Sequence, residues 1–280
     1  MKIALFLNRQ KDEAWKIARD ILDYLKARGV QVALEDEVAK EMGGLPISKV
    51  DPKSISFRIS LGGDGTILRF LHRYKEISAP LVGINLGGLG FLADVPISEI
   101  FSALDHLLKG EFTIEERLVI EGQKAGQEFW PAFNDIVFHR ASNPSLVEIS
   151  VTVDGVFLNT FAADGLIIAT TTGSTAYSLA AGGPILTPSI KALALTPISP
   201  HTISNRPLVL LPQREIVVQY MGKSSPIEVR YDGIDGHTLE SGEICRIKVS
   251  EKVFPLVSFP HHDYFSTLRT KLGWAGKLKS

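Results

Sequence analysis

The sequence predicts an α/β domain with a parallel, doubly wound sheet, followed by an all-β domain. Over roughly residues 1–110, short apolar runs alternate with amphipathic segments of helical period. After Gly110 the helical period gives way to short alternating or apolar runs broken by Gly and Pro. The chain has 280 residues, 45% hydrophobic and 22% charged, enough for two ordinary domains with real cores.

Composition also limits the partners of the protein. A formal net charge of −1 gives no basic footprint for a nucleic acid. Cys245 is the only cysteine, which excludes an internal disulfide and a cysteine metal cluster and favours a reducing compartment. No run approaches the ~18 apolar residues that span a bilayer, and the first apolar run is too short for a signal peptide. We therefore expect a soluble, cytoplasmic protein with no nucleic-acid or membrane partner.

The first domain is expected to alternate strands and helices. Expected strands cover residues 2–8, 30–34, 55–61 and 80–86, and expected helices cover 12–28, 67–74 and 98–109. Residues 36–54 show no clean period and are expected to form a loop or a mobile flap. In such sheets ligands bind at the carboxyl ends of the strands.

The segment Leu61-Gly62-Gly63-Asp64-Gly65-Thr66 lies between an expected strand and an expected helix. Backbone N–H groups at the start of a helix suit a phosphate, and glycines allow a pyrophosphate to touch the backbone. Asp64 would repel that anion, so we interpret it as a proton acceptor or as a group that helps to hold a cation. The alternative is that Gly-Asp-Gly is only a tight turn.

A second glycine-rich segment, Gly88-Leu89-Gly90 with Ala93, formally fits the dinucleotide fingerprint G-x-G-x-x-A. That fingerprint should open a helix at once, but Pro96 intervenes, so we reject it and expect a second loop that faces the first. Phe91 could then lie against a flat ring, although a core phenylalanine is the commoner outcome. A Walker A loop ending at Lys223 is also rejected, because Val217 stands where its first glycine should be.

The second domain is expected to consist of short strands. They cover residues 118–121, 128–139, 146–153, 156–161, 165–170, 207–211, 215–221, 226–231 and 243–249. Asp154-Gly155 is a hairpin turn signal, and Asp263 is expected to cap a final helix that docks elsewhere. The expected division is residues 1–111, 112–255 and 256–280, the last being a helix that returns to the first domain.

Two polar segments of the second domain suggest a binding site. Asn134 and Asp135 interrupt an apolar strand, where at least one polar group would be buried without reason unless it served a ligand or the strand ended. Residues 163–184 run from an apolar strand into a hydroxyl-rich loop, whose groups suit ribose and phosphate oxygens. The alternative there is a Thr-rich turn that caps a helix.

Three further motifs are interpreted as structural on sequence grounds. Asp232-Gly233 and Asp235-Gly236 are expected to be turns, and His261-His262-Asp263 is expected to be a helix entry rather than a metal site.

Taken together, these segments resemble the NAD kinases. The Gly62-to-Thr66 motif alone is shared with diacylglycerol and sphingosine kinases and with phosphofructokinase-like folds. Its combination with Asn134-Asp135, the segment 171–184, the segment 200–207 and the closing segment 268–274 is much more specific. The resemblance departs at Asp135, where the family more often has glutamate, and at Thr171, where proline is usual.

The resemblance implies transfer of the γ-phosphoryl group of ATP to the 2′-hydroxyl of the adenosine ribose of NAD, with Asp64 as the general base. It implies a phosphate-binding loop of Gly62, Gly63, Gly65 and Thr66. It implies an NAD site comprising Asp64, Gly65, Arg69, Phe91, Asn134, Asp135, Asp164, Thr175, Ala176, Tyr177, Ser178, Leu179, Ala180 and Asp232. Asp232 matches an acidic residue that can approach the ligand from a neighbouring subunit of a homodimer or homotetramer.

The metal expected from the resemblance is Mg²⁺, held mainly by phosphate oxygens and without a dedicated protein cluster, with Asp64 as a candidate contact. Two alternatives stay open: a kinase of the same fold that phosphorylates a lipid or sugar hydroxyl, and a non-catalytic NAD-binding regulator. The regulator would have no need of Asp64 in the glycine loop.

Overall fold

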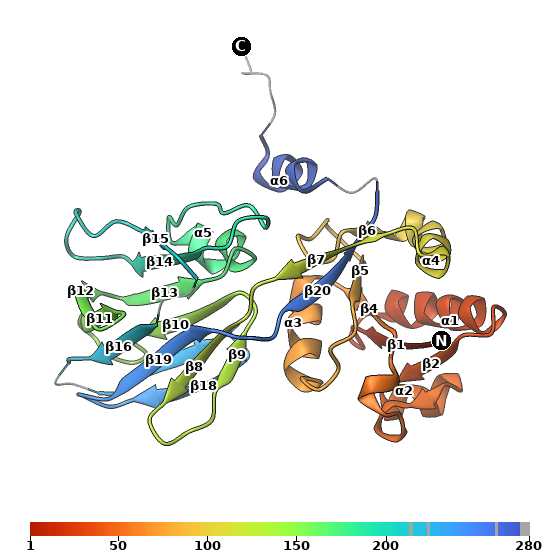
Figure 1. Cartoon of the computed structure of the whole chain (residues 1–280), viewed down its shortest axis with the longest axis horizontal. Coiled ribbons are helices and arrows are strands. Elements are labelled where there is room, and N and C mark those ends of the chain that lie inside the picture. Colours follow the sequence, from red (N-terminus) through yellow and green to blue (C-terminus); the bar gives the residue numbers. More distant parts are fainter. Residues whose placement is uncertain (213–214, 223–224, 261–262, 275–280) are drawn as a thin grey trace, which may run out of the picture. The chain divides into compact units, whose positions relative to one another are not determined.

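The structure is a computed structural model that describes residues 1–212, 215–222, 225–260 and 263–274. The chain forms two compact units, Met1–Glu116 with Pro255–Ser280, and Arg117–Phe254 (Figure 1). The first unit is an α/β structure and the second is rich in β-strands. The expected fold class is thereby confirmed.

One eight-stranded sheet organises the first unit. Its strands are β1 (Lys2–Leu7), β2 (Gln31–Leu34), β3 (Leu45–Pro46), β4 (Phe57–Gly62), β5 (Leu81–Asn85), β6 (Val95–Pro96), β7 (Thr113–Arg117) and β20 (Phe254–Ser258). They follow the order β3-β2-β1-β4-β5-β20-β7, with β6 beside β5. Strand β4 pairs in parallel with β1 and β5, with Leu61 opposite both Leu7 and Ile84. The residues that follow these three strands therefore lie at one edge of the sheet.

Helices cover both faces of this sheet. They are α1 (Asp12–Lys26), α2 (Asp36–Met42), α3 (Asp64–Arg73) and α4 (Ile100–Lys109), with short 3-10 turns at Ile47–Lys49, Pro52–Ser54 and Ile97–Glu99. A further helix of this unit, α6 (Tyr264–Leu272), follows β20 in the chain. Leu5 and Leu7 of β1 belong to the same core cluster as buried residues of α1, α2 and α4. Phe6 points the other way, because neighbouring strand residues face opposite sides, and stacks on Phe70 of α3.

The expectation of a loop or flap over residues 36–54 is wrong in its first part, which is helix α2. Val38, Ala39 and Met42 are buried on one face of this helix. Gly43, at φ 74°, ends it in the left-handed conformation that favours glycine. Seven residues supply fewer than two full turns of the apolar pattern, so the helical period was too short to recognise.

The C-terminal part adds a strand to the first unit that the sequence did not suggest. Strand β20 pairs in parallel with β5, with Leu256 opposite Leu81, and precedes helix α6. The cap expected for that helix is confirmed, because the Asp263 carboxylate accepts hydrogen bonds from the N–H groups of Phe265 and Ser266. The expected helix entry at His261-His262 lies outside the described residues.

Two six-stranded antiparallel sheets form the second unit. Their strands are β8 (Ile120–Lys124), β9 (Trp130–Ala132), β10 (Asp135–His139), β11 (Val147–Val153), β12 (Val156–Ala163), β13 (Gly165–Ala169), β14 (Leu193–Ile198), β15 (Leu208–Leu210), β16 (Ile216–Tyr220), β17 (Ile227–Tyr231), β18 (Asp235–Leu239) and β19 (Ile244–Val249). The orders are β15-β14-β13-β10-β17-β18 and β12-β11-β16-β19-β8-β9. One core cluster joins inward residues of both sheets, including Phe138 and Ile149. The sheets therefore pack face to face.

The turns of this unit confirm two expectations and correct a third. Asp154-Gly155 and Asp232-Gly233 are hairpin turns in which all four residues have positive φ. Asp235-Gly236 is not a turn but the start of β18, paired with β17. Glycine is required at position 236 of this strand, because a Cβ there would lie 2.3 Å from the Val229 carbonyl oxygen.

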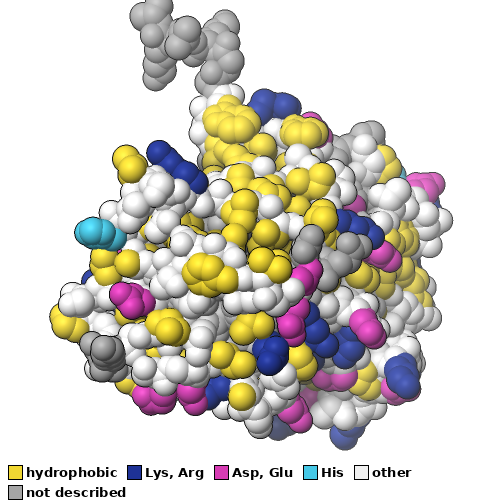
Figure 2. Space-filling view, turned by 60° about the vertical axis from the view of Figure 1, so that its left-hand side comes forward, with side chains coloured by type: hydrophobic (Ala, Val, Ile, Leu, Met, Phe, Trp, Pro, Cys, Tyr) yellow, Lys and Arg dark blue, Asp and Glu magenta, His cyan; other side chains and the backbone are white. Residues whose placement is uncertain are grey.

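None of the described helices is long and apolar enough to cross a membrane. On the face seen in Figure 2, basic and acidic side chains are interspersed with hydrophobic ones.

Candidate functional site

The first candidate site is the turn from β4 into α3. Gly62 ends the strand, Gly63 is the N-cap and Asp64 is the first residue of the helix. Gly62 is required by packing, because a Cβ there would lie 2.3 Å from the Thr66 hydroxyl oxygen. A Cβ atom added to Gly63 or Gly65 would have no neighbouring atom within 4 Å, and neither glycine has a positive φ. Neither packing nor backbone conformation accounts for these two glycines, which leave an open stretch of backbone.

Asp64 joins this turn to the second glycine-rich segment. Its Oδ2 accepts a hydrogen bond from the Phe91 N–H at 2.9 Å. Its Oδ1 accepts bonds from the N–H groups of Leu92 at 3.1 Å and Ala93 at 2.9 Å. A Cβ on Gly90 would lie 2.2 Å from the same Oδ1, so glycine is required there for the carboxylate to approach. The expectation that the two loops face one another is confirmed.

The segment after Gly90 leads to β6, and the helix of this region, α4, begins only at Ile100. The rejection of the dinucleotide fingerprint is therefore confirmed. Phe91 is half-buried and lies 5.9 Å, ring centre to ring centre, from Tyr264 of the last helix. The Lys271 ammonium lies 5.6 Å from the centre of the Phe91 ring.

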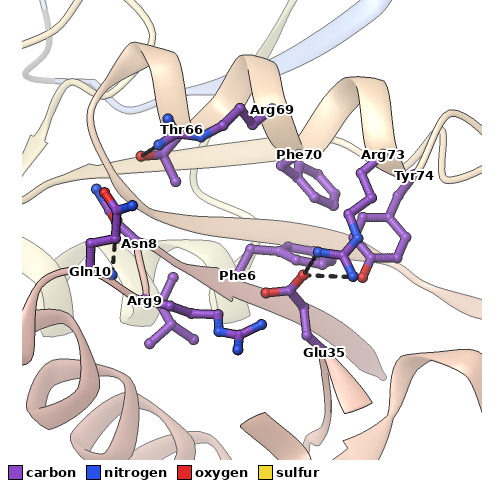
Figure 3. Close-up of a pocket in the computed structure, with 11 residues that line it drawn as sticks. Phe6, Asn8, Arg9, Gln10, Glu35, Thr66, Arg69, Phe70, Arg73 and Tyr74 are labelled. Carbon is purple, nitrogen blue, oxygen red and sulfur yellow. Dashed lines mark hydrogen bonds and ion pairs between the residues drawn. The ribbon is translucent and has the colours of Figure 1, made fainter. Parts of the chain in front are cut away.

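Beside α3, a cavity of ≈ 260 Å³ extends from Thr66 past Arg69 to Tyr74 (Figure 3). The Arg69 guanidinium donates a long hydrogen bond of 3.4 Å to the Thr66 hydroxyl. Sequence reasoning singled out Arg69 here but missed the residues opposite it, which come from β1 and from the end of β2.

The second candidate site lies in the second unit, between β9 and β10. Residues 133–134 interrupt the strand that was expected to be continuous over 128–139. The Asp232 carboxylate accepts hydrogen bonds from the N–H groups of Phe133, Asn134 and Asp135, at distances of 2.7–3.1 Å. The amide oxygen of Asn134 is buried and has no hydrogen-bond partner among the described residues.

Asp135 is only 5% exposed and lies beside Asp232. Burial, and to a lesser extent the neighbouring Asp232 carboxylate, raise the pKa of Asp135 to about 7. A buried carboxyl group of this kind can exchange a proton or accept a hydrogen bond from a ligand near neutral pH.

The hydroxyl-rich loop after β13 is hydrogen-bonded to residues 133–134, between β9 and β10. Thr170, which sequence reasoning did not single out, donates its hydroxyl hydrogen to the Phe133 carbonyl oxygen at 2.6 Å. Its backbone N–H donates to the Asn134 carbonyl oxygen at 2.8 Å. Gly173 lies so close that a Cβ would be 2.0 Å from that same oxygen. The structure thus brings Asn134, Asp135 and Asp232 together with the start of the loop.

The residues expected to line a site after this loop differ in what their side chains do. The Thr175 hydroxyl donates to the Thr172 carbonyl oxygen at 3.1 Å. Ser178 is buried and shares a hydrogen bond of 3.0 Å with the Thr196 hydroxyl. Tyr177 is 43% exposed and begins the short helix α5 (Tyr177–Ala180), which contains Leu179 and Ala180 and follows the N-cap Ala176. The helix has Ala181 as its C-cap, and Gly182 follows it at φ 86°, so the expected ending at Gly182-Gly183-Pro184 is confirmed to within two residues.

Asp164 does not join this cluster. It precedes β13, whereas Thr170 follows the same strand, so the six residue steps between them correspond to roughly 20 Å. Its carboxylate pairs with the Arg140 guanidinium, with Oδ1 2.8 Å from Nε. The expected strand over residues 165–170 could have shown this, because the two ends of an extended strand lie far apart.

Within the described residues, no three His, Cys, Asp or Glu side chains gather into a group that could hold a metal ion. Asp64 has the donor chemistry for a divalent cation, since a carboxylate offers about four lone-pair positions and three of them receive N–H groups.

Comparison with known proteins assigns both halves of the chain. The family model of the ATP-NAD kinase N-terminal domain matches residues 3–112, and that of the ATP-NAD kinase C-terminal domain matches residues 133–259. An NAD kinase of Protochlamydia amoebophila is 53% identical over 277 residues, which cover 99% of each chain. An NAD kinase of Syntrophotalea carbinolica is 36% identical over 282 residues, covering 98% of each chain.

Solved structures share the fold. The structure of yeast NADH kinase complexed with NADH superimposes with a TM-score of 0.89 at 23% identity, covering 100% of this chain and 89% of the other. An NAD kinase from Archaeoglobus fulgidus in complex with ATP gives a TM-score of 0.75 at 26% identity, covering 96% and 99%.

The two family models, which match an α/β unit with a glycine loop and a β-rich unit, define this protein as a kinase. More narrowly, the chain belongs to the NAD kinase family, and its activity is that of an NAD kinase.

Proposed function

We propose that the phosphorylation of NAD by this chain uses Asp64 as the general base that takes the proton of the adenosine ribose 2′-hydroxyl. The observation that carries this proposal is the way in which three backbone N–H groups hold the Asp64 carboxylate. They fix its position and still leave a lone pair for the hydroxyl hydrogen. A positioned base of this kind typically contributes ~10²–10⁴-fold to the rate.

The phosphates of ATP bind at Gly62, Gly63, Gly65 and Thr66. The open backbone at Gly63 and Gly65 supports this assignment, because phosphate oxygens can approach it without meeting a side chain. Phosphoryl transfer requires alignment and charge neutralisation more than covalent help. A divalent cation such as Mg²⁺ supplies part of that neutralisation when bound, with the phosphates as its main ligands.

The dinucleotide binds through the residues that the resemblance to the family implies. In the first unit these are Asp64, Gly65, Arg69 and Phe91. In the second unit they are Asn134, Asp135, Asp164, Thr175, Ala176, Tyr177, Ser178, Leu179, Ala180 and Asp232. The unpartnered oxygen of Asn134 and the buried carboxyl of Asp135 support a role in accepting N–H or O–H groups of the ligand.

A homodimer or homotetramer in the cytoplasm completes the proposal. In such an assembly Asp232 is the acidic residue that the resemblance to the family places near the ligand of a neighbouring subunit.

The test is the production of NADP. Purified protein is incubated with ATP, Mg²⁺ and NAD, and the product is offered to an NADP-specific dehydrogenase. We expect reduction that depends on all three components. Absence of a reducible product, with NAD binding intact, would instead support a non-catalytic NAD-binding regulator.

A further inference from the structure

Helix α6 contacts the second glycine-rich segment through Phe91. The Tyr264 ring lies 5.9 Å, centre to centre, from the Phe91 ring, and the Lys271 ammonium lies 5.6 Å from the centre of that ring. Tyr264 and Lys271 are separated by about two helical turns, so they lie on one face of α6. The buried residues of the helix, Thr267 and Leu268, lie on the same face. This face is therefore the one that meets Phe91.

The two ends of the row of N–H groups at residues 91–93 are held differently. Leu92 and Ala93 are fully buried, and they pack on β5 so closely that a Cβ on Gly83 would lie 2.1 Å from the Leu92 carbonyl oxygen. Phe91 is only half-buried, and its ring meets two side chains of α6. Packing on the sheet thus fixes residues 92 and 93, whereas the position of residue 91 depends on α6.

The two oxygens of the Asp64 carboxylate receive unequal numbers of hydrogen bonds. Oδ1 accepts two, from the N–H groups of Leu92 and Ala93, and a Cβ on Gly90 would lie 2.2 Å from it. Oδ2 accepts one, from the Phe91 N–H at 2.9 Å. A carboxylate oxygen has about two lone pairs, so Oδ1 is saturated and Oδ2 keeps one for a hydroxyl hydrogen. The Phe91 N–H is therefore the group that orients the reactive oxygen.

We propose that Tyr264 and Lys271 are positioning residues for phosphoryl transfer. Through the Phe91 ring they hold the Phe91 N–H in place, and that N–H directs Oδ2 of Asp64 toward the hydroxyl group that loses its proton. This inference rests on the proposed function, to which it adds a role for helix α6. The contribution of both side chains is indirect, because it passes through Phe91 and requires no contact with the substrate. Displacement of a reacting group by about 1 Å costs up to ~10²-fold in rate, so contacts remote from the reaction affect turnover.

The first test is steady-state NADP formation by two variants of α6. Tyr264→Leu removes the ring, and its kcat should fall about 10-fold. Lys271→Met keeps most of the length of the side chain but removes the charge, and its kcat should fall about 3-fold. The KM for ATP should stay unchanged in both variants, because the glycine loop keeps its sequence and its place at the end of β4.

Two further variants separate positioning from a general loss of structure. Tyr264→Phe keeps the ring and should recover most of the kcat that is lost in Tyr264→Leu. Arg269→Met removes an exposed cation of the same helix, one that pairs with Asp263, and its kcat should stay within about twofold of wild type. An unchanged kcat in both Tyr264→Leu and Lys271→Met would overturn the proposal. If only the KM for NAD rose, the proposal would also fail, and the contacts would serve ligand binding alone.

Combination with Asp64→Asn shows whether the contacts act through the carboxylate. Once the side chain at position 64 no longer takes the proton, its orientation matters little, so adding Tyr264→Leu should change the residual turnover by less than about twofold. An equal fall in both backgrounds would overturn the proposal, because α6 would then act elsewhere.

Hydrogen exchange of backbone amides, followed by NMR on the full chain without ligand, separates this inference from the reaction itself. In Tyr264→Leu the Phe91 amide hydrogen should exchange about 10-fold faster, while those of Leu92 and Ala93 keep their rates. Unchanged exchange at Phe91 would overturn the proposal, whatever the turnover. Normal turnover of Asp64→Asn together with faster exchange at Phe91 in Tyr264→Leu would refute the proposed function but support the control of this loop by α6.

Discussion

Asp64 in the first unit and Asp232 in the second are held in the same way. Each carboxylate accepts hydrogen bonds from the N–H groups of three successive residues, 91–93 for Asp64 and 133–135 for Asp232. The surroundings differ. Asp64 lies between glycines that leave open backbone, whereas Asp232 lies in a hairpin turn beside the buried carboxyl of Asp135.

The comparison shows that hydrogen bonds from three backbone N–H groups, by themselves, only fix the position of a carboxylate. At Asp232 the contact closes the gap between β9 and β10, which fixes Asn134 and Asp135. At Asp64 the same contact joins two loops at the ligand edge of a parallel sheet, next to backbone that a phosphate can reach. We therefore expect loss of either carboxylate to lower stability, and loss of Asp64 to lower turnover as well.

The largest effect is expected from Asp64→Asn. An amide cannot take the hydroxyl proton, so turnover should fall by about two orders of magnitude or more while NAD binding stays nearly intact. Steady-state NADP formation and NAD titration measure the two quantities. Normal turnover would remove Asp64 from the catalytic role and make it equivalent to Asp232.

Asp232→Asn should lower the free energy of unfolding by about 2–3 kcal/mol, because charge-assisted hydrogen bonds to three N–H groups are weakened. Denaturant unfolding followed by fluorescence measures the change. Asp235→Asn, three residues further on in β18, is the matched control and should stay within about 0.5 kcal/mol of wild type. Equal stability of the two variants would contradict the anchoring role of Asp232.

Asp135→Asn should change the pH dependence of stability. The pKa of Asp135 is about 7 in the folded chain and near 3.9 when unfolded, so the folded state binds more protons between these values. Wild-type stability therefore falls as the pH rises from about 4 to 7, and the variant, which has no such titration, lacks this fall. Unfolding at pH 5 and pH 8 should show the variant gaining on the order of 2 kcal/mol relative to wild type at the higher pH. A constant difference would show that this carboxyl is ionised throughout.

The smallest effects on stability are expected from alanine substitutions at two glycines, Gly90 and Gly63, which should differ in their effect on the KM for ATP. Gly90→Ala should cost about 1–2 kcal/mol, because its methyl group would meet the Asp64 carboxylate. Gly63→Ala should change stability by less than about 1 kcal/mol but raise the KM for ATP, since the new methyl group meets only open space in the protein. Thermal unfolding and donor kinetics of both variants test this. An unchanged KM in Gly63→Ala would return that glycine to the turn-only interpretation.

Local patterns predicted those parts of the molecule whose structure is decided by neighbours in sequence. The helix α1, the hairpin at Asp154-Gly155, the cap at Asp263 and the glycine turn into α3 all follow from residues a few positions apart. Strand β14 was missed because Pro197 interrupts its apolar run.

Contacts between distant residues could not be predicted in this way. Asp64 meets residues 27 to 29 positions away, and Asp232 meets residues nearly a hundred positions away. Glu35 lies between β2 and α2, as the N-cap of α2, and only the fold brings it opposite Tyr74. The groove beside α3 had no sequence signal, because its polar and aromatic members come from three separate segments.

Strand β20 lies between β5 and β7 in the sheet, although more than a hundred residues separate it from either of them in the chain. During synthesis, β5 and β7 leave the ribosome long before the strand that joins them. Until β20 arrives, β7 and the part of β5 that β6 does not pair carry unpaired backbone edges open to intermolecular pairing. The N-terminal unit is thus the first to be translated and among the last to be finished, and a fragment ending after β7 would lack the piece that closes its own sheet.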